Sequence, residues 1–204
     1  MPTSEPDLRF AKTIAGFDQL NADDRRREFV DGIARPREVV YSERMSACLA
    51  RLYPQASESL RLAARAQHIC RWQIVRQDYP VGRDGYNAWR AACRGHHTAL
   101  ATSVMRECGY AEAECARVAS LIAKENLKRD PDSQALENVV GVVFVEYYLA
   151  AFVEGHADYD EAKLLGILRK TMRKLDGVGH AAIHSLALPE PMRRLVSAAM
   201  AGGG

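Results

Sequence analysis

The residues best suited to chemistry gather in one segment, Gln67–His97. It contains both tryptophans of the chain together with two tyrosines, five arginines and three histidines. Neutral imidazoles are good ligands for first-row divalent metals. Guanidinium groups bind phosphate or carboxylate in a planar, two-pronged manner, and aromatic rings can stack on a base or on an arginine. The segment therefore predicts a metal site, an anion site, or both.

The histidines of this segment lie on two predicted helices. His68 ends the helical pattern SESLRLAARAQHICRW, in which Leu60, Ala64 and His68 follow at steps of four. His97 lies late in the next helix, and two helices joined by one loop usually pack antiparallel. Their imidazoles are therefore expected to converge on a divalent metal ion. The alternative is that a histidine on an apolar face is a hydrogen-bonded core residue.

Polar residues interrupt the most apolar helix, LENVVGVVFVEYYL. They are Glu137, Asn138 and Glu146, and the last two are eight residues apart, on roughly one face. A buried carboxylate needs a metal ion, an arginine or a proton. Glu137 is therefore the predicted third metal ligand beside His68 and His97, and an arginine from the preceding loop segment would satisfy a carboxylate equally well.

The arginines of the segment suit an anionic small molecule, and its aromatic residues suit the wall of a pocket. The alternative is that the arginines pair with nearby acids and solvate a helix face. The predicted ligand-binding residues are Arg71, Trp72, Arg83, Tyr86, Trp89 and Arg90.

Composition narrows the class of protein. The 204 residues are 48% hydrophobic and 26% charged, with a net charge of +2, which excludes intrinsic disorder and a broad nucleic-acid surface. The five cysteines never form Cys-x-x-Cys, so we expect reduced thiols, with Cys93 and His97 a weak candidate nucleophile pair. The apolar run Val139–Val153 is shorter than the roughly 20 residues of a spanning helix, so we expect a cytoplasmic protein without membrane contact.

The periodicity is helical nearly throughout, with strand signals almost absent, which predicts an all-α fold of about eight or nine helices. We expect one domain over residues 1–204, with 1–35 a more peripheral helical segment and 201–204 a flexible tail. An irregular stretch at 73–83 is the only long inner loop. Helices are expected near residues 10–20, 36–52, 57–72, 84–107, 111–126, 135–153, 159–175, 181–186 and 190–200.

Several motifs resemble a family known as domain of unknown function 4202. They are ARAQHICRW, the pattern YPxGRxGYxxWR, His97, LENV and VFVEYY, and the resemblance extends from RFAKTIAGFD to ILRKTMRKL. The family implies a helical fold and no assigned reaction.

A more distant likeness links the chain to the HD-type metal phosphohydrolases, in which His and Asp residues from several helices hold one or two metals. His68 is similar to the histidine of their His–Asp pair, and ECGYAEAECARVASLI followed by LENVV is similar to the later part of that fold. Ile69 stands where the paired Asp is expected, and Asn138 stands where LEDV is expected. Either Glu137 substitutes or the metal site is lost.

Three hypotheses for the function follow. The first is an HD-like, metal-dependent hydrolase acting on a phosphorylated or other anionic small molecule, such as a nucleotide, with His68, His97 and Glu137 holding a divalent metal that activates water. The second is a protein that binds its ligand or partner through the Arg/aromatic pocket without metal or catalysis. The third is a metal-dependent oxygenase on the same scaffold.

Overall fold

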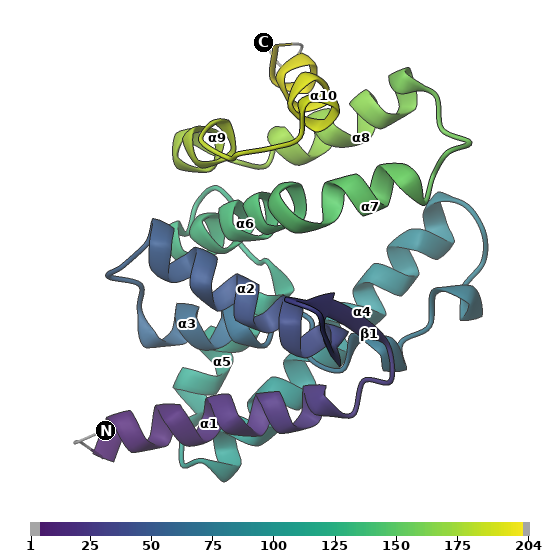
Figure 1. Ribbon diagram of the computed structural model, residues 1–204. Coiled ribbons are helices and arrows are strands. Elements are labelled where there is room, and N and C mark those ends of the chain that lie inside the picture. The colour runs from purple at the N-terminus through teal and green to yellow at the C-terminus, as the bar shows by residue number, and fades with distance from the viewer. Residues whose placement is uncertain (1–4, 202–204) are drawn as a thin grey trace. The chain divides into compact units, whose positions relative to one another are not determined.

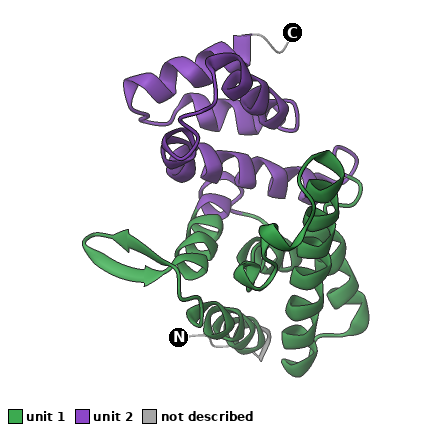
Figure 2. Ribbon diagram, turned by 90° about the vertical axis from the view of Figure 1, so that its right-hand side faces the viewer, with its two compact units in different colours: residues 1–47, 55–126 green, residues 48–54, 127–204 purple. Residues whose placement is uncertain are grey.

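The computed structural model describes residues 5–201, whose regular structure is ten α-helices, one two-stranded hairpin and three short helical segments. The described chain is therefore nearly all helical, as predicted. It divides into two compact units, shown in Figure 2. Unit 1 comprises residues 1–47 and 55–126, and unit 2 comprises residues 48–54 and 127–204. The single domain expected from the sequence stays a prediction, because two compact units can belong to one domain.

Unit 1 holds the N-terminal helices and the irregular stretch 73–83, which is called the loop segment below (Figure 1). Helix α4 packs against α5, α5 against α3, and α1 against both α3 and α4. Fully buried side chains at the centre of this unit include Phe17, Met45, Leu60, Ile69 and Met105. Its elements are α1 (Glu5–Ala22), β1 (Arg27–Val30), β2 (Ile33–Pro36), most of α2 (Arg37–Leu52), α3 (Glu58–Arg65), the 3-10 turns η1 (Arg71–Gln73) and η2 (Arg76–Asp78), α4 (Arg83–Glu107) and α5 (Glu112–Ala123).

The hairpin β1–β2 is the exception to the all-α pattern among the described residues, and the nearly absent strand signals did not indicate it. It extends away from the helices of unit 1 in Figure 2. Asp31 and Gly32 form its two-residue loop, both with positive φ, and Asp-Gly is a strong signal for such a turn. The strands are only four residues long, too short for a clear alternating pattern. One face is tied to α2, because Glu28 pairs with Arg44 and Arg35 with Glu43.

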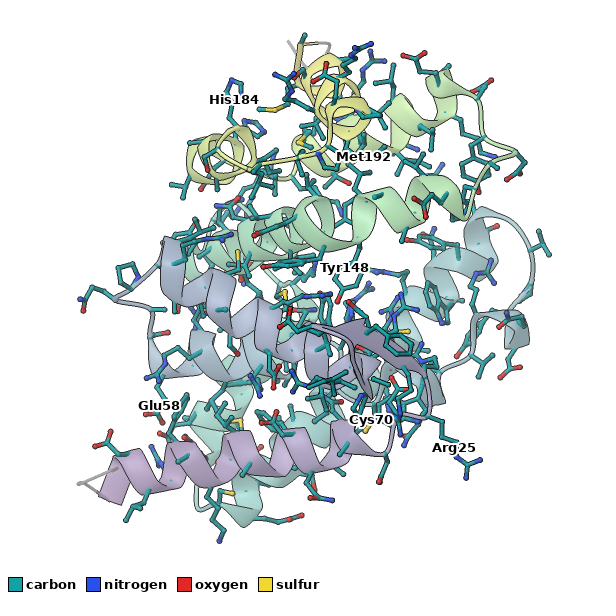
Figure 3. All side chains as sticks on the ribbon, in the orientation of Figure 1. Arg25, Glu58, Cys70, Tyr148, His184 and Met192 are labelled. Carbon is teal, nitrogen blue, oxygen red and sulfur yellow. The ribbon has the colours of Figure 1, made fainter. Side chains whose placement is uncertain are left out.

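Helix α3 ends at Arg65, seven residues before the predicted end at Trp72. The chain then turns, and Cys70, labelled in Figure 3, takes a positive φ of 50°. Its backbone N–H donates to Asn21 Oδ1 at 3.0 Å. This bond to α1 replaces a helical one, so a contact distant in sequence stops the helix that local periodicity favours.

The loop segment folds back on the first turn of α4. Arg76 donates to the carbonyl oxygens of Tyr79 and Pro80 at 3.0 and 3.1 Å. The Pro80 carbonyl lies so close to Gly85 that a Cβ there would be 1.9 Å from its oxygen. Only glycine allows this approach, so the loop segment has a defined path.

Unit 2 is built around one long helical run, which carries a π-helical turn in its middle. Tyr148, labelled in Figure 3, ends that turn. Helix α6 packs against α9, and α8 packs against α10. The elements are the end of α2, α6 (Pro131–Val143), the π-helical segment η3 (Phe144–Tyr148), α7 (Leu149–Glu154), α8 (Glu161–Met172), α9 (Gly177–His184) and α10 (Glu190–Ala201). Of the expected tail, only Ala201 is described, as the last residue of α10; residues 202–204 lie outside the described residues.

The run Pro131–Glu154 is long and apolar enough to cross a membrane by length and composition, with a mean hydropathy of 1.6 in its most apolar window. Half of that window is buried inside the protein. The core helix of a soluble protein passes the same test, so this single run is weak evidence for a membrane span. The cytoplasmic location stays a prediction.

Candidate functional site

His97 is held in one defined state on the buried face of α4. The residue is 2% exposed, and its Nδ1 lies 2.8 Å from the carbonyl oxygen of Ile69. Burial lowers the pKa of this imidazole to about 3, helped by the charges of Arg71, His96 and Arg90 and opposed by the bond to Ile69. The ring is therefore neutral near pH 7, with its proton on Nδ1. Its Nε2 has no hydrogen-bond partner among the described residues.

His68 lies beside His97, with 5.9 Å between the ring centroids. It stacks on Tyr41 of α2 at 4.1 Å with the ring planes 11° apart. Burial lowers the pKa of His68 well below its ordinary value, and the nearby Arg71 acts in the same direction. Its Nδ1 is 3.8 Å from Glu38 Oε2, but an uncharged ring is attracted only weakly. The two imidazoles predicted to converge are thus both close together and neutral.

Glu38, which lies beside His68, forms a small acidic cluster with Asp24. Arg26 donates to both Asp24 and Glu38, at 3.0 and 2.7 Å. Asp24 is fully buried and Glu38 is 4% exposed. Burial raises the pKa of the Glu38 carboxyl, and Arg26 offsets part of that rise. Two buried carboxylates therefore share one guanidinium.

Arg71 and Arg90 supply positive charge to the same place. Burial lowers the pKa of Arg71, and so does the charge of Arg90. The Arg71 guanidinium lies over the ring of Trp89, 4.7 Å from its centroid, and the Trp89 indole N–H donates to the Ile74 carbonyl oxygen at 3.0 Å. In the described part of the chain, no carboxylate lies within ion-pair distance of Arg71 or Arg90. Arg71 is thus a largely buried cation resting on an aromatic ring.

The other predicted ligand-binding residues are spread more widely. Tyr86 contacts Trp89, with 5.7 Å between centroids, and is 48% exposed. Trp72 is half-buried in η1, and Arg83 is an exposed residue at the start of α4. The structure therefore brings Arg71, Arg90 and Trp89 together and shows no contact that places Trp72 or Arg83 with them.

The thiols of this region are not activated. Burial raises the pKa of Cys93, four residues before His97, although Arg71 and Arg90 oppose the rise. Burial also raises the pKa of Cys70 to about 11. Both groups are thiols rather than thiolates near pH 7, which does not favour a Cys93–His97 nucleophile pair.

The carboxylates of the apolar helix belong to unit 2, where they find partners within that unit. Glu137 is 5% exposed and pairs with Lys174 at 3.4 Å. Glu146 pairs with Arg51 at 2.7 Å. Each therefore meets a cation other than an arginine of the loop segment. Among the described residues, no group of three or more His, Cys, Asp or Glu side chains is placed to hold a metal ion.

Several residues of this region escaped prediction from the sequence, among them Asp24 and Arg26, which pair with each other. Glu38 and Tyr41 are three residues apart, a spacing that puts both on one helix face. Gln67 is buried, and its Oε1 has no hydrogen-bond partner in the described residues. The spacing of Glu38 and Tyr41 can be read from the sequence. Nothing in the neighbouring sequence, however, indicates that this face of α2 contacts His68.

The family profile Domain of unknown function (DUF4202) matches residues 11–196, and the chain belongs to this family. The match leaves out only residues 1–10 and 197–204, so it covers most of both units. No curated protein and no solved structure matches the chain. Function therefore has to be inferred from the site itself.

Proposed function

We propose that unit 1 binds a small anionic molecule, a phosphate ester in the first instance, through Arg71 and Arg90 next to His68 and His97. The observation that carries this proposal is the state of Arg71. Its guanidinium is largely removed from water beside a second arginine, and its pKa is lowered. A bound anion would compensate this charge, and bidentate contacts to phosphate suit a guanidinium.

The local charge balance supports the proposal. The carboxylates of Asp24 and Glu38 are both engaged by Arg26. Glu38 attracts Arg71 only from beyond ion-pair distance. Because the two imidazoles are neutral, the cations around them outnumber the carboxylates: Arg71 and Arg90 have no carboxylate partner among the described residues, and Lys124 also acts on His68. An anionic ligand would offset this excess of positive charge.

An HD-like, metal-dependent hydrolase is the finer form of this proposal, and its donor set is incomplete in unit 1. His97 has the arrangement of a metal ligand, since its Nδ1–H binds a backbone carbonyl and its Nε2 is unpartnered. His68 would be the second ligand. The expected third, Glu137, contacts Lys174 in unit 2. We therefore derive no metal-dependent step, and binding without a metal is the function the geometry favours.

The test is anion-dependent thermal stabilisation. Binding at 100 times the dissociation constant adds about 2.7 kcal/mol to the free energy of unfolding, so the melting temperature should rise with added propyl phosphate. Arg71→Met should lose this rise, because methionine keeps the apolar contact with Trp89 but not the charge. The matched control is Arg37→Met, since Arg37 is an exposed arginine of the same unit.

An equal rise in both variants would reduce the effect to nonspecific salt stabilisation, and no rise in the wild type would overturn the proposal. Metal analysis of protein purified without chelator tests the finer form. Stoichiometric metal that is lost in His97→Phe would restore the hydrolase hypothesis.

A further inference from the structure

His97 presents a buried hydrogen-bond acceptor that no described residue uses. The rings of His68 and His96 both lie 5.9 Å from its ring, centroid to centroid, and neither bonds to it. The Ile69 carbonyl can only accept a hydrogen bond, so it fixes the proton on Nδ1 and leaves a lone pair on Nε2. A buried acceptor without a donor is costly, by about 1–3 kcal/mol.

This lone pair restricts what can bind beside it. A phosphate dianion offers no proton, so its oxygens would be repelled by Nε2. A protonated amine would be repelled by Arg71 and Arg90, whose charges already act on His97. A neutral hydroxyl group satisfies both conditions, because it donates a proton and carries no charge.

We propose that His97 Nε2 accepts a hydrogen bond from a hydroxyl group of the ligand, so that the site takes hydroxylated phosphate esters such as phosphorylated polyols and sugars. This inference rests on the proposed anion binding by Arg71 and Arg90. Two further buried atoms without partners, Gln67 Oε1 and His96 Nε2, lie in the same stretch of unit 1. His97 is singled out because its proton position is set by the backbone.

The experiment compares three phosphate esters with the same three-carbon chain: glycerol 3-phosphate, which carries two hydroxyl groups, propyl phosphate, which carries none, and 3-aminopropyl phosphate, which carries one amine. Affinities of the full-length protein are measured by calorimetry. The wild type should bind glycerol 3-phosphate about tenfold more tightly than propyl phosphate, which corresponds to about 1.4 kcal/mol, and should bind the amine most weakly. His97→Phe should lose the tenfold preference, so that glycerol 3-phosphate and propyl phosphate have equal affinities for the variant. His184→Phe, at an exposed position on α9, should keep the preference.

The outcomes separate the two proposals. Equal affinity for glycerol 3-phosphate and propyl phosphate would overturn the hydroxyl contact and leave anion binding intact. Tightest binding of the amine would also overturn the hydroxyl contact. No binding of any probe would overturn both proposals.

A spectroscopic measurement keeps the test independent of how well the variant folds. The ¹⁵N shift of His97 Nε2 in the wild type should report an unprotonated nitrogen. It should move on addition of glycerol 3-phosphate and stay in place with propyl phosphate. Identical shifts with both probes would contradict the hydroxyl contact.

Discussion

Two clusters of buried polar groups, one in each unit, differ in how far their hydrogen bonds are satisfied. In unit 2, Asn138 is fully buried and uses both ends of its amide. It donates to Tyr53 Oη at 2.6 Å and Asp176 Oδ1 at 2.7 Å, and it accepts from Gln134 at 3.1 Å. In unit 1, His97 and Gln67 are also buried, yet each keeps an atom that has no hydrogen-bond partner among the described residues. Arg169 Nε is the matching exception in unit 2.

This difference separates polar groups that hold the fold together from the polar groups that we propose to contact a ligand. A satisfied buried network stabilises and specifies a structure, whereas an unsatisfied one costs stability. Proteins keep such costs where function requires them. The comparison favours a structural role for the polar residues of the apolar helix and agrees with the binding role that we propose for the cluster around His97.

The largest expected effect is on the network of unit 2. Asn138→Leu removes an amide that makes four hydrogen bonds, including one from the Asp176 backbone N–H, and leaves those partners unsatisfied. The free energy of unfolding should fall by about 3 kcal/mol in urea titrations. Asn87→Leu, at an exposed position, should change it by less than about 0.5 kcal/mol. If Asn138→Leu also lowered the free energy of unfolding by less than about 0.5 kcal/mol, the network around Asn138 would not have the structural role that distinguishes it from the cluster around His97.

The next effect concerns pH and unit 1. In the folded protein the pKa of His97 is about 3, whereas an unfolded histidine titrates near about 6.5. Between these values only the unfolded chain binds the proton. The contribution of the neutral His97 to the free energy of unfolding is therefore complete above about pH 6.5 and is lost as the pH falls. The loss is at most about 1.4 kcal/mol per pH unit, or about 2 kcal/mol from pH 6.5 to 5.

The measurement is urea unfolding at those two pH values for the wild type and His97→Phe. Glu38, whose raised pKa has the opposite effect, cancels in the difference between the two proteins. His68 acts in the same direction as His97 and is present in both proteins. An equally steep pH dependence in His97→Phe would show that His97 is not held neutral by burial.

A smaller effect with the opposite sign is expected at Arg71. Arg71→Met removes a cation that burial disfavours, so the free energy of unfolding should stay unchanged or rise by up to about 1 kcal/mol. The same variant should lose stabilisation by propyl phosphate. A clear loss of stability in the absence of anion would instead make Arg71 a structural residue, like Asn138.

The smallest effect is expected at the ion pair of Arg51 and Glu146. Half of the Arg51 side chain is exposed, so the pair is worth about 0.2–1 kcal/mol and should weaken with salt. Arg51→Met should show this loss in urea titrations at low ionic strength. It should keep the stabilisation by propyl phosphate, and loss of that stabilisation would contradict the separation of roles.

Prediction from the sequence worked best where the signal is local. The stripe of α5 and the apolar helix expected at 135–153 are patterns within one segment, and they formed as helices. The prediction failed at α3, where Asn21 draws the backbone of Cys70 out of the helix. It also missed the hairpin, whose four-residue strands are too short for a pattern and are held by ion pairs to α2.

For the candidate site, the sequence indicated the residue types and the segment. It identified Gln67–His97 as the place where histidine, arginine and aromatic side chains meet, and the structure puts the rings of His68 and His97 5.9 Å apart. It did not find Glu38 or Tyr41, because a helix periodicity defines a face without naming what that face contacts.

The sequence by itself determined the helical class and the family, since both depend on periodicity and motifs that are written along the chain. The tertiary structure alone decided which polar groups found partners. Asn138 meets Tyr53 across 85 positions, and Glu146 meets Arg51 across 95. Satisfaction of a buried group depends on atoms brought close by folding, so the unpartnered Nε2 of His97 becomes visible only in three dimensions.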